Sequence, residues 1–367
     1  MDKIKKFISA QMPVDICNLN CSYCYVKNYS PDLKNKRHSA KFTYDINLLR
    51  KAMSYERLGG ACLINIVGDG ETVIPEEILQ ITRILLESGH YVFITTNGTQ
   101  TLRQKQFAEF PPELKRRLGF KFSYHYKELV RTGLLDTYYA NLNMMRKCGC
   151  SVNIELVPGD DLIELIDDIK ESIYNAVGSL CHVTLPRVGA SSDKGLLSDF
   201  SLDDFVDKWS SFGSAQLQYK KTIQGVKVKE FCYAGAWSYI LDLSNGNIKQ
   251  CHKSNYNSNI FKNMEKPLPK FAIGNNCREA YCWCGHIYMP LGVVPELNAP
   301  TYDAMRNKVC NDGSEWLWPE MKQFMHQKLY DNNRKYSKLE KLMCNVLNKL
   351  LINLNRIKAK AKKILKR

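Results

Sequence analysis

Along residues 12–187, short continuous apolar runs alternate with longer stretches in which apolar residues recur at helical spacing. Short runs rich in β-branched and aromatic residues predict strands, and the stretches between them repeat apolar positions every three or four residues, which predicts helices. Because each strand is followed by a helix or a crossover, the order predicts an α/β fold with a parallel sheet and helices outside it. The six expected strands span residues 12–17, 62–68, 91–98, 119–126, 151–158 and 180–186.

The pattern changes in the second half of the chain. Residues 239–253 predict a β-hairpin, with Asn245 and Gly246 as the pair preferred for a tight type I′ turn. A cysteine-dense, irregular segment follows at 277–290, and the chain is expected to be helical again from about residue 315.

Composition indicates a folded protein without a membrane span. The chain has 367 residues, of which 44% are hydrophobic, and no apolar run reaches the roughly 18 residues that a spanning helix requires. The N-terminal residues lack the apolar segment of a signal peptide, so we expect a cytoplasmic protein whose thiols stay reduced. Its 14 cysteines then bind metal, react, or pack as small apolar residues, as we expect of Cys62.

Three cysteines stand within eight residues, directly after the first expected strand. They are Cys17, Cys21 and Cys24. A structural zinc ion normally takes four protein ligands, whereas three leave one position for an exchangeable partner. A four-iron cluster held by three cysteines likewise leaves one iron open.

The spacing Cys17-x3-Cys21-x2-Cys24, with Tyr23 before the last cysteine, resembles the signature of the radical S-adenosylmethionine (SAM) superfamily. The resemblance implies a partial (β/α)6 TIM-like barrel and a [4Fe–4S] cluster whose open iron binds SAM. It also implies reductive cleavage of SAM to a 5′-deoxyadenosyl radical that abstracts hydrogen from substrate. An electron donor such as flavodoxin or ferredoxin is then expected.

A glycine motif after the second expected strand resembles the segment of that family that holds the SAM amino group. Its residues are Gly68, Gly70 and Glu71, with Asp69 and Thr72 as departures from the usual pattern. Glycine lets the backbone approach a ligand closely, and an acid can pair with an ammonium. The alternative is an ordinary loop.

Later strand ends supply further candidates by the same resemblance. Asn97 ends the third strand, Ser123 is expected to contact the SAM ribose, and His125 is a candidate catalytic residue at the cavity mouth. Arg187, after the sixth strand, is expected to pair with the SAM carboxylate. A core histidine and a solvated arginine are the open alternatives for the last two.

A second constellation resembles the auxiliary-cluster domains called SPASM and, in shortened form, twitch. Too few cysteines remain for two further clusters, so the resemblance implies a single second [4Fe–4S] cluster. Four ligands are expected among five cysteines, namely Cys232, Cys251, Cys277, Cys282 and Cys284. The departure from the usual closing Cys-x2-Cys pair leaves the choice open, and zinc with His286 or uncoordinated thiols are the alternatives.

The resemblance leaves several reactions open: dehydrogenation, epimerisation, or modification of a peptide or sugar. The substrate is expected to be a small molecule, a sugar or a peptide. With the signature beginning at residue 17, no leader-peptide-binding domain is expected before it, which makes a peptide less expected without excluding it. Epimerisation needs a thiol that returns a hydrogen atom. The unassigned candidates, for each of which burial is the alternative, are Cys148, Cys150, Cys181 and Cys310.

The charge of the chain is concentrated at its C-terminus. Residues 338–367 hold ten Lys or Arg against the single acid Glu340, and so contribute +9 of the net +15. Their apolar residues recur at helical spacing, which predicts a basic amphipathic helix. It is expected either to lie on an anionic membrane surface or to dock on the barrel through its apolar stripe. Nucleic acid is not expected as a partner, since no RNA-binding module is recognised.

Three parts of the chain are therefore expected. A radical SAM partial barrel spans 10–225, a small Cys-rich α+β domain of the twitch or SPASM kind spans 226–300, and a helical tail spans 315–367. The alternative from another class is a metal-binding structural protein, associated with nucleic acid or membrane and without SAM chemistry. Iron with SAM cleavage supports the enzyme, and zinc supports the alternative.

Overall fold

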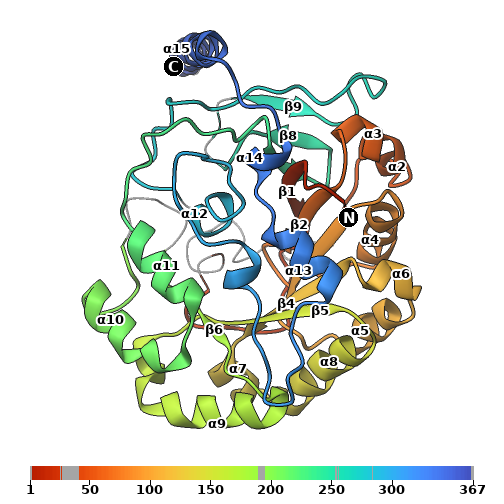
Figure 1. The fold of residues 1–367 in the computed structure, drawn as a ribbon, viewed down its shortest axis with the longest axis vertical. Helices are drawn as coiled ribbons and strands as arrows, with labels where there is room; N and C mark the ends of the chain where they lie inside the picture. Colours follow the sequence, from red (N-terminus) through yellow and green to blue (C-terminus); the bar gives the residue numbers. More distant parts are fainter. Residues whose placement is uncertain are drawn as a thin grey trace.

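The structure is a computed structural model that describes residues 2–24, 26, 41–188, 195–252, 254, 256–282 and 284–364, without the side chains of 355, 356 and 358–364. It contains one nine-stranded sheet with the strand order β6-β5-β4-β3-β2-β1-β7-β8-β9. Helices α2 to α11 lie around the outside of this sheet, as Figure 1 shows.

The six expected parallel strands are present. Each pairs in parallel with its neighbour in the chain, so the part up to β6 is an α/β fold with the sheet of a partial TIM barrel. Their bounds are β1 (Lys6–Met12), β2 (Cys62–Gly68), β3 (Tyr91–Thr96), β4 (Leu118–Tyr124), β5 (Ser151–Leu156) and β6 (His182–Val183).

The first strand lies earlier than the sequence predicts. The strand expected over residues 12–17 ends at Met12, and Pro13 cannot donate a ladder hydrogen bond. Val14 is apolar because it is buried beneath the loop that follows. The segment of residues 13–24, here named the cysteine loop, therefore starts at the carboxyl end of β1.

Helices and short 3-10 turns connect the parallel strands. α4 shows why these segments are helical, since Ile78, Ile81 and Leu85 recur on one buried face. The helices are α2 (Leu48–Ala52), α3 (Tyr55–Leu58), α4 (Glu77–Glu87), α5 (Thr101–Ala108), α6 (Pro112–Lys115), α7 (Tyr126–Arg131), α8 (Leu135–Lys147), α9 (Ile166–Val177), α10 (Leu202–Lys208) and α11 (Ala215–Ile223). The 3-10 turns among them are η2 (Asp160–Leu165) and η3 (Ser210–Phe212), and a third turn, η4 (Asp303–Met305), comes after the last strand of the sheet.

The second half of the chain extends the same sheet. β7 (Ser238–Asp242) pairs in parallel with β1, and β8 (Asn247–Lys249) and β9 (Asn257–Asn259) add antiparallel strands. The part expected to form the small Cys-rich domain, 226–300, is therefore joined to the barrel sheet by the backbone hydrogen bonds of β7. The domain boundary expected at 225–226 stays a prediction.

The hairpin of β7 and β8 is confirmed, but its turn is not of type I′. Gly246 has φ +74° whereas Asn245 does not have a positive φ, so a single left-handed residue closes a loop of four residues. The Asp242 carboxylate stabilises this loop by accepting hydrogen bonds from the Ser244 N–H at 2.9 Å and from Asn245 Nδ2 at 2.8 Å.

Both faces of the strands nearest β1 are buried. Ile8 and Ile64 pack into the larger hydrophobic cluster, and Phe7 and Leu63 pack into a second cluster that includes Phe324. The second cluster is covered by the C-terminal helices α12 (Gly285–Tyr288), α13 (Pro319–His326) and α14 (Leu329–Asn332). This double coverage explains the continuous apolar runs of the strands.

The last helix, α15 (Lys338–Ile364), lies at the edge of the molecule (Figure 1). Its polar side docks on the body: Asn348 Nδ2 donates to the Ala272 carbonyl at 2.7 Å, and Cys344 Sγ contacts the same oxygen at 3.0 Å. Its apolar stripe is exposed, so docking through that stripe is wrong. No helix among the described residues is long and apolar enough to cross a membrane.

Candidate functional site

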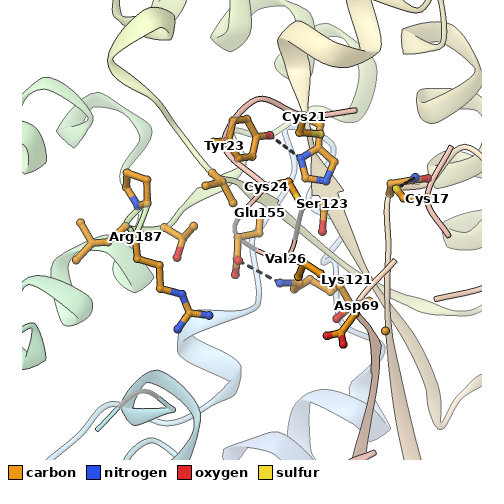
Figure 2. A pocket seen from close by; sticks show the side chains of 18 of the residues that line it. Cys17, Cys21, Tyr23, Cys24, Val26, Asp69, Lys121, Ser123, Glu155 and Arg187 are labelled. Atoms are coloured by element: carbon orange, nitrogen blue, oxygen red, sulfur yellow. Dashed lines mark hydrogen bonds and ion pairs between the residues drawn. The ribbon is translucent and has the colours of Figure 1, made fainter. Parts of the chain in front are cut away.

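A cavity of about 450 Å³ lies at the carboxyl ends of the parallel strands, where the cysteine loop covers them. Figure 2 shows the cysteines, Tyr23, Ser123 and Arg187 around this space. Every residue expected to hold the first cluster or SAM lines it, and so does His125, the catalytic candidate. These residues are Cys17, Cys21, Tyr23, Cys24, Gly68, Gly70, Glu71, Asn97, Ser123, His125 and Arg187.

The glycine motif clamps the cysteine loop. The Gly70 N–H donates to the Val14 carbonyl and the Glu71 N–H to the Ile16 carbonyl, both at 2.8 Å. A Cβ added at Gly70 would lie 2.2 Å from the Ile16 oxygen, and one at Gly68 would lie 2.5 Å from Val14 Cγ1. These glycines therefore allow the close approach of two backbone segments, whereas the sequence predicts the approach of a ligand.

The Glu71 carboxylate faces the end of β3. One oxygen accepts from the Thr96 hydroxyl at 2.6 Å and the other from the Asn97 N–H at 2.7 Å. Burial raises the pKa of Glu71 to about 7, against these hydrogen bonds. Its observed contacts position the strand end, and its pairing with the SAM ammonium stays a prediction.

Asn97 connects the end of β3 to the cysteine loop. Its Nδ2 donates to Asn18 Oδ1 at 2.9 Å and lies 3.8 Å from Cys17 Sγ. Its Oδ1 accepts from the N–H and the hydroxyl of Thr99, at 3.1 and 2.8 Å. Asn18 in turn donates to the Thr99 hydroxyl at 2.8 Å, so this network fixes the backbone beside Cys17.

His125 contacts the cysteine loop through Tyr23. The Tyr23 hydroxyl lies 2.6 Å from His125 Nδ1 (Figure 2). Burial lowers the pKa of His125 to about 4, and the charge of Lys121 acts in the same direction, so the ring is neutral at pH 7. This contact makes His125 a positioning residue for the loop, and its catalytic role stays a prediction.

The thiols of the loop fit an iron–sulfur cluster chemically. Burial raises the pKa of Cys17, and it raises that of Cys21 to about 12. Both thiols are thus protonated in the protein alone, and a bound cation is what converts such thiols to thiolate ligands. Cys24 lies in the same turn, since its N–H donates to the Cys21 carbonyl at 3.2 Å.

One end of the cavity carries charged residues that the sequence analysis missed. Lys121 Nζ lies 3.1 Å from Glu155 Oε1 (Figure 2), and Arg306 Nη1 lies 2.9 Å from Glu155 Oε2. Lys220 on α11 also lines the cavity, and its ammonium donates to the Thr184 hydroxyl. A signal was present in β4, where Lys121 shares the period-2 face of Ser123 within an otherwise apolar strand.

Comparison with known families agrees with this geometry. Residues 12–171 match the family described as the Radical SAM superfamily. This part of the chain belongs to the radical SAM superfamily. None of the curated proteins compared matches the chain.

Solved structures resemble this chain at low identity. Streptococcus suis SuiB bound to S-adenosylmethionine has a TM-score of 0.47 and 15% identity, over 71% of this chain and 65% of SuiB. The protein anSMEcpe with bound AdoMet has a TM-score of 0.49 and 14% identity, over 70% of this chain and 78% of its own. BtrN in complex with AdoMet and 2-DOIA has a TM-score of 0.31 and 12% identity, over 72% of this chain and 82% of BtrN. The chain thus spans less than two thirds of the length of SuiB.

The second group of cysteines gathers beside the radical SAM cavity. Burial raises the pKa of Cys282 well above its usual value, and the charges of Cys284, Cys232, Cys251 and Cys277 act on it in the same direction. All five pack against the second hydrophobic cluster. Cys282 and His286 line the same cavity as the cysteine loop, so both constellations border one space.

Neither group of cysteines converges on a single point. Within the described ranges, no three His, Cys, Asp or Glu side chains are placed to share one metal ion. A four-iron cluster differs from a single ion in this respect, because each cysteine binds a different iron. Which four of the five auxiliary candidates would serve is still open.

The cysteines considered as hydrogen donors do not line the radical SAM cavity. Cys150, Cys181 and Cys310 are buried in the larger hydrophobic cluster, and Cys148 packs against it. Their placement favours the packing role.

Proposed function

We propose that this protein is a radical SAM enzyme that abstracts hydrogen from an organic substrate. The cavity carries the proposal, because it collects three clustered thiols and the polar ends of five parallel strands around one space. When bound, a reduced [4Fe–4S] cluster and SAM supply a 5′-deoxyadenosyl radical. Flavodoxin or ferredoxin is the expected class of electron donor.

Some residues of this chain would bind the cluster or SAM, and others position the cysteine loop. Cys17, Cys21 and Cys24 would hold the cluster. The glycine motif and Asn97 keep the cysteine loop against the strand ends through the contacts described above. Ser123 and Arg187 are the residues we assign to the SAM ribose and carboxylate.

We assign an auxiliary [4Fe–4S] cluster to four of the five cysteines of the second group, which are Cys282 and its neighbours Cys232, Cys251, Cys277 and Cys284. What supports this is their mutual proximity and the position of Cys282 on the cavity wall. A cluster there could accept an electron from a substrate radical or anchor the substrate. The proposed reaction is a dehydrogenation, an epimerisation, or the modification of a peptide or sugar.

The test is anaerobic reconstitution with iron and sulfide, followed by iron counting and a dithionite-driven assay for 5′-deoxyadenosine. We expect about eight irons per chain and SAM cleavage. The Cys21→Ser variant should lose about half of the iron and all cleavage, while Cys148→Ser, which lies outside the cavity, should lose neither. A colourless protein that binds zinc and leaves SAM intact would establish the structural alternative.

We also propose that α15 binds an anionic membrane surface. Its exposed apolar side chains form one stripe, made of Leu339, Leu342, Met343, Val346, Leu347, Leu350, Leu354 and Ile357. The net charge of +9 over residues 338–367 favours anionic lipid headgroups and opposes pairing with a second equally basic copy. The side chains of the most basic end, 358–367, lie outside the described residues.

This contact can be tested by sedimentation of the full chain with vesicles of phosphatidylcholine, with and without phosphatidylserine. We expect binding that requires phosphatidylserine and weakens with salt. The double variant Leu342→Glu with Leu350→Glu should abolish it. Leu102→Glu, at a side chain of α5 that is 71% exposed, is the matched control and should bind normally. Vesicle binding unaffected by the double variant would refute the assignment.

A further inference from the structure

The basic end of the cavity is not explained by the cluster or by SAM. Lys121 on β4, Lys220 on α11 and Arg306 surround the single carboxylate of Glu155 on β5. Three cations thus face one anion. The other acids of the cavity wall, Asp15, Asp69 and Glu71, lie on the cysteine loop and at the end of β2.

Glu155 is fully engaged by its neighbours. Its Oε1 accepts from Lys121 at 3.1 Å, and its Oε2 accepts from Arg306 at 2.9 Å and from Gln216 Nε2 at 2.6 Å. Burial alone would raise the pKa of Glu155, but Lys121, Arg306 and Lys220 hold it well below its usual value. It therefore carries one negative charge and cannot balance all three cations.

Lys220 is the cation without a carboxylate of its own. Its ammonium donates to the Thr184 hydroxyl, and across the part of the chain that the structure describes no carboxylate forms an ion pair with it. A buried charge is stabilised when it is paired and hydrogen-bonded, so this excess of positive charge favours a bound anion.

The position of Lys220 directs that anion toward the second group of cysteines. α11 also supplies Ile223 and Gln224 to the cavity wall. It packs on the auxiliary segment, since a Cβ at Gly285 would lie 2.9 Å from Ile223 Cδ1. The residues assigned to SAM come from β2, β3, β4 and the loop after β6, whereas Lys220 comes from the helix that faces Cys282.

We propose that Lys220, together with Lys121, binds an oxyanion of the substrate, a carboxylate or a phosphate group. Calling this group part of the substrate rests on the radical SAM function proposed above. The pair would anchor the substrate between the two cysteine constellations by charge-assisted hydrogen bonds.

The protonation of Lys220 agrees with such a site. Burial lowers its pKa to about 7, Glu155 opposes this shift, and Arg187, Lys121 and Arg306 act with burial. An anion beside the ammonium stabilises the charged form. Binding of an anion is therefore expected to raise the pKa of Lys220 toward its ordinary value.

The experiment measures the binding of inorganic phosphate and of acetate to the reconstituted full chain, by calorimetry at saturating SAM. Lys220→Gln should weaken binding at least about tenfold, and Lys220→Arg should restore most of it. Lys221→Gln is the matched control, because Lys221 is the next residue of α11 and pairs at the surface with Asp203 at 2.7 Å. It should bind like the wild type.

Three results would overturn the proposal. They are no saturable binding of either anion to the wild type, equal binding by Lys220→Gln, and a loss of SAM affinity in Lys220→Gln with phosphate and acetate binding unchanged. The last result would assign Lys220 to the SAM carboxylate. Iron content and SAM cleavage of the same preparations report separately on the radical SAM function, so its failure is distinguishable from failure of the anion site.

Discussion

Replacing Gly70 by alanine tests whether the glycine motif holds the cysteine loop. The added Cβ would lie 2.2 Å from the Ile16 oxygen and 2.6 Å from its carbonyl carbon, both backbone atoms. Real Cβ contacts essentially never fall below 3.0 Å, so the two segments must separate by about 1 Å. That displacement breaks the hydrogen bonds from Gly70 and Glu71 to the loop, each 2.8 Å long.

The energetic cost is local. Two backbone hydrogen bonds contribute about 0.5–1.5 kcal/mol each, so the loop loses about 1–3 kcal/mol of its attachment. A domain is stable by about 5–15 kcal/mol, and the fold should therefore survive. The cysteine loop should not keep its geometry, because the displaced residues precede Cys17 directly.

The assay is iron counting and SAM cleavage after anaerobic reconstitution, with thermal unfolding as the check on folding. Gly70→Ala should retain about four of about eight irons, those of the auxiliary cluster, and lose SAM cleavage. Gly195→Ala is the control, since no atom of the described residues lies within 4 Å of its added Cβ and its φ is not positive. A Gly70→Ala protein with full iron and normal cleavage would refute the clamp.

Three further predictions each concern a single residue. Cys232→Ser should lose about half of the iron while cleavage of SAM persists, and a full complement of iron would remove Cys232 from the auxiliary set. Tyr23→Phe removes the hydroxyl that lies 2.6 Å from His125 Nδ1, so the first cluster should be lost faster on dilution. SAM cleavage per remaining cluster should be unchanged, and an unaltered rate of iron loss contradicts this prediction. His90 is buried, donates from Nε2 to the Met53 carbonyl at 2.6 Å, and has a pKa lowered by burial from 6.5 to about 4. Its folded form binds fewer protons than the unfolded chain, so His90 should contribute about 2 kcal/mol less stability at pH 5 than at pH 7.5. The measurement is urea unfolding of the wild type and of His90→Gln at both pH values, and an equal pH dependence of the two proteins would count against the prediction.

Much of the fold was predictable from the sequence because its signals are local. Strand period, helical stripes and the Asn245–Gly246 turn region each depend on neighbours in the chain, and β2 to β6 lie where these patterns predict. The first strand was misplaced because buried loop residues such as Val14 look like strand residues in a one-dimensional pattern. The pairing of β7 with β1 could not be predicted, since it joins residues more than 200 positions apart.

The sequence by itself determined which chemical groups gather at the candidate site. Three cysteines at fixed spacing, a glycine motif and polar residues at strand ends resemble the radical SAM pattern, and the order of the strands places them on one loop and one edge of a sheet. The tertiary structure decided what these residues contact. It showed that Gly70 approaches the cysteine loop, that Lys121 pairs with Glu155 whereas Lys220 donates to Thr184, and that the apolar stripe of α15 is exposed. These contacts bring together residues remote in the chain, and only the packing of the whole sheet and its helices determines them.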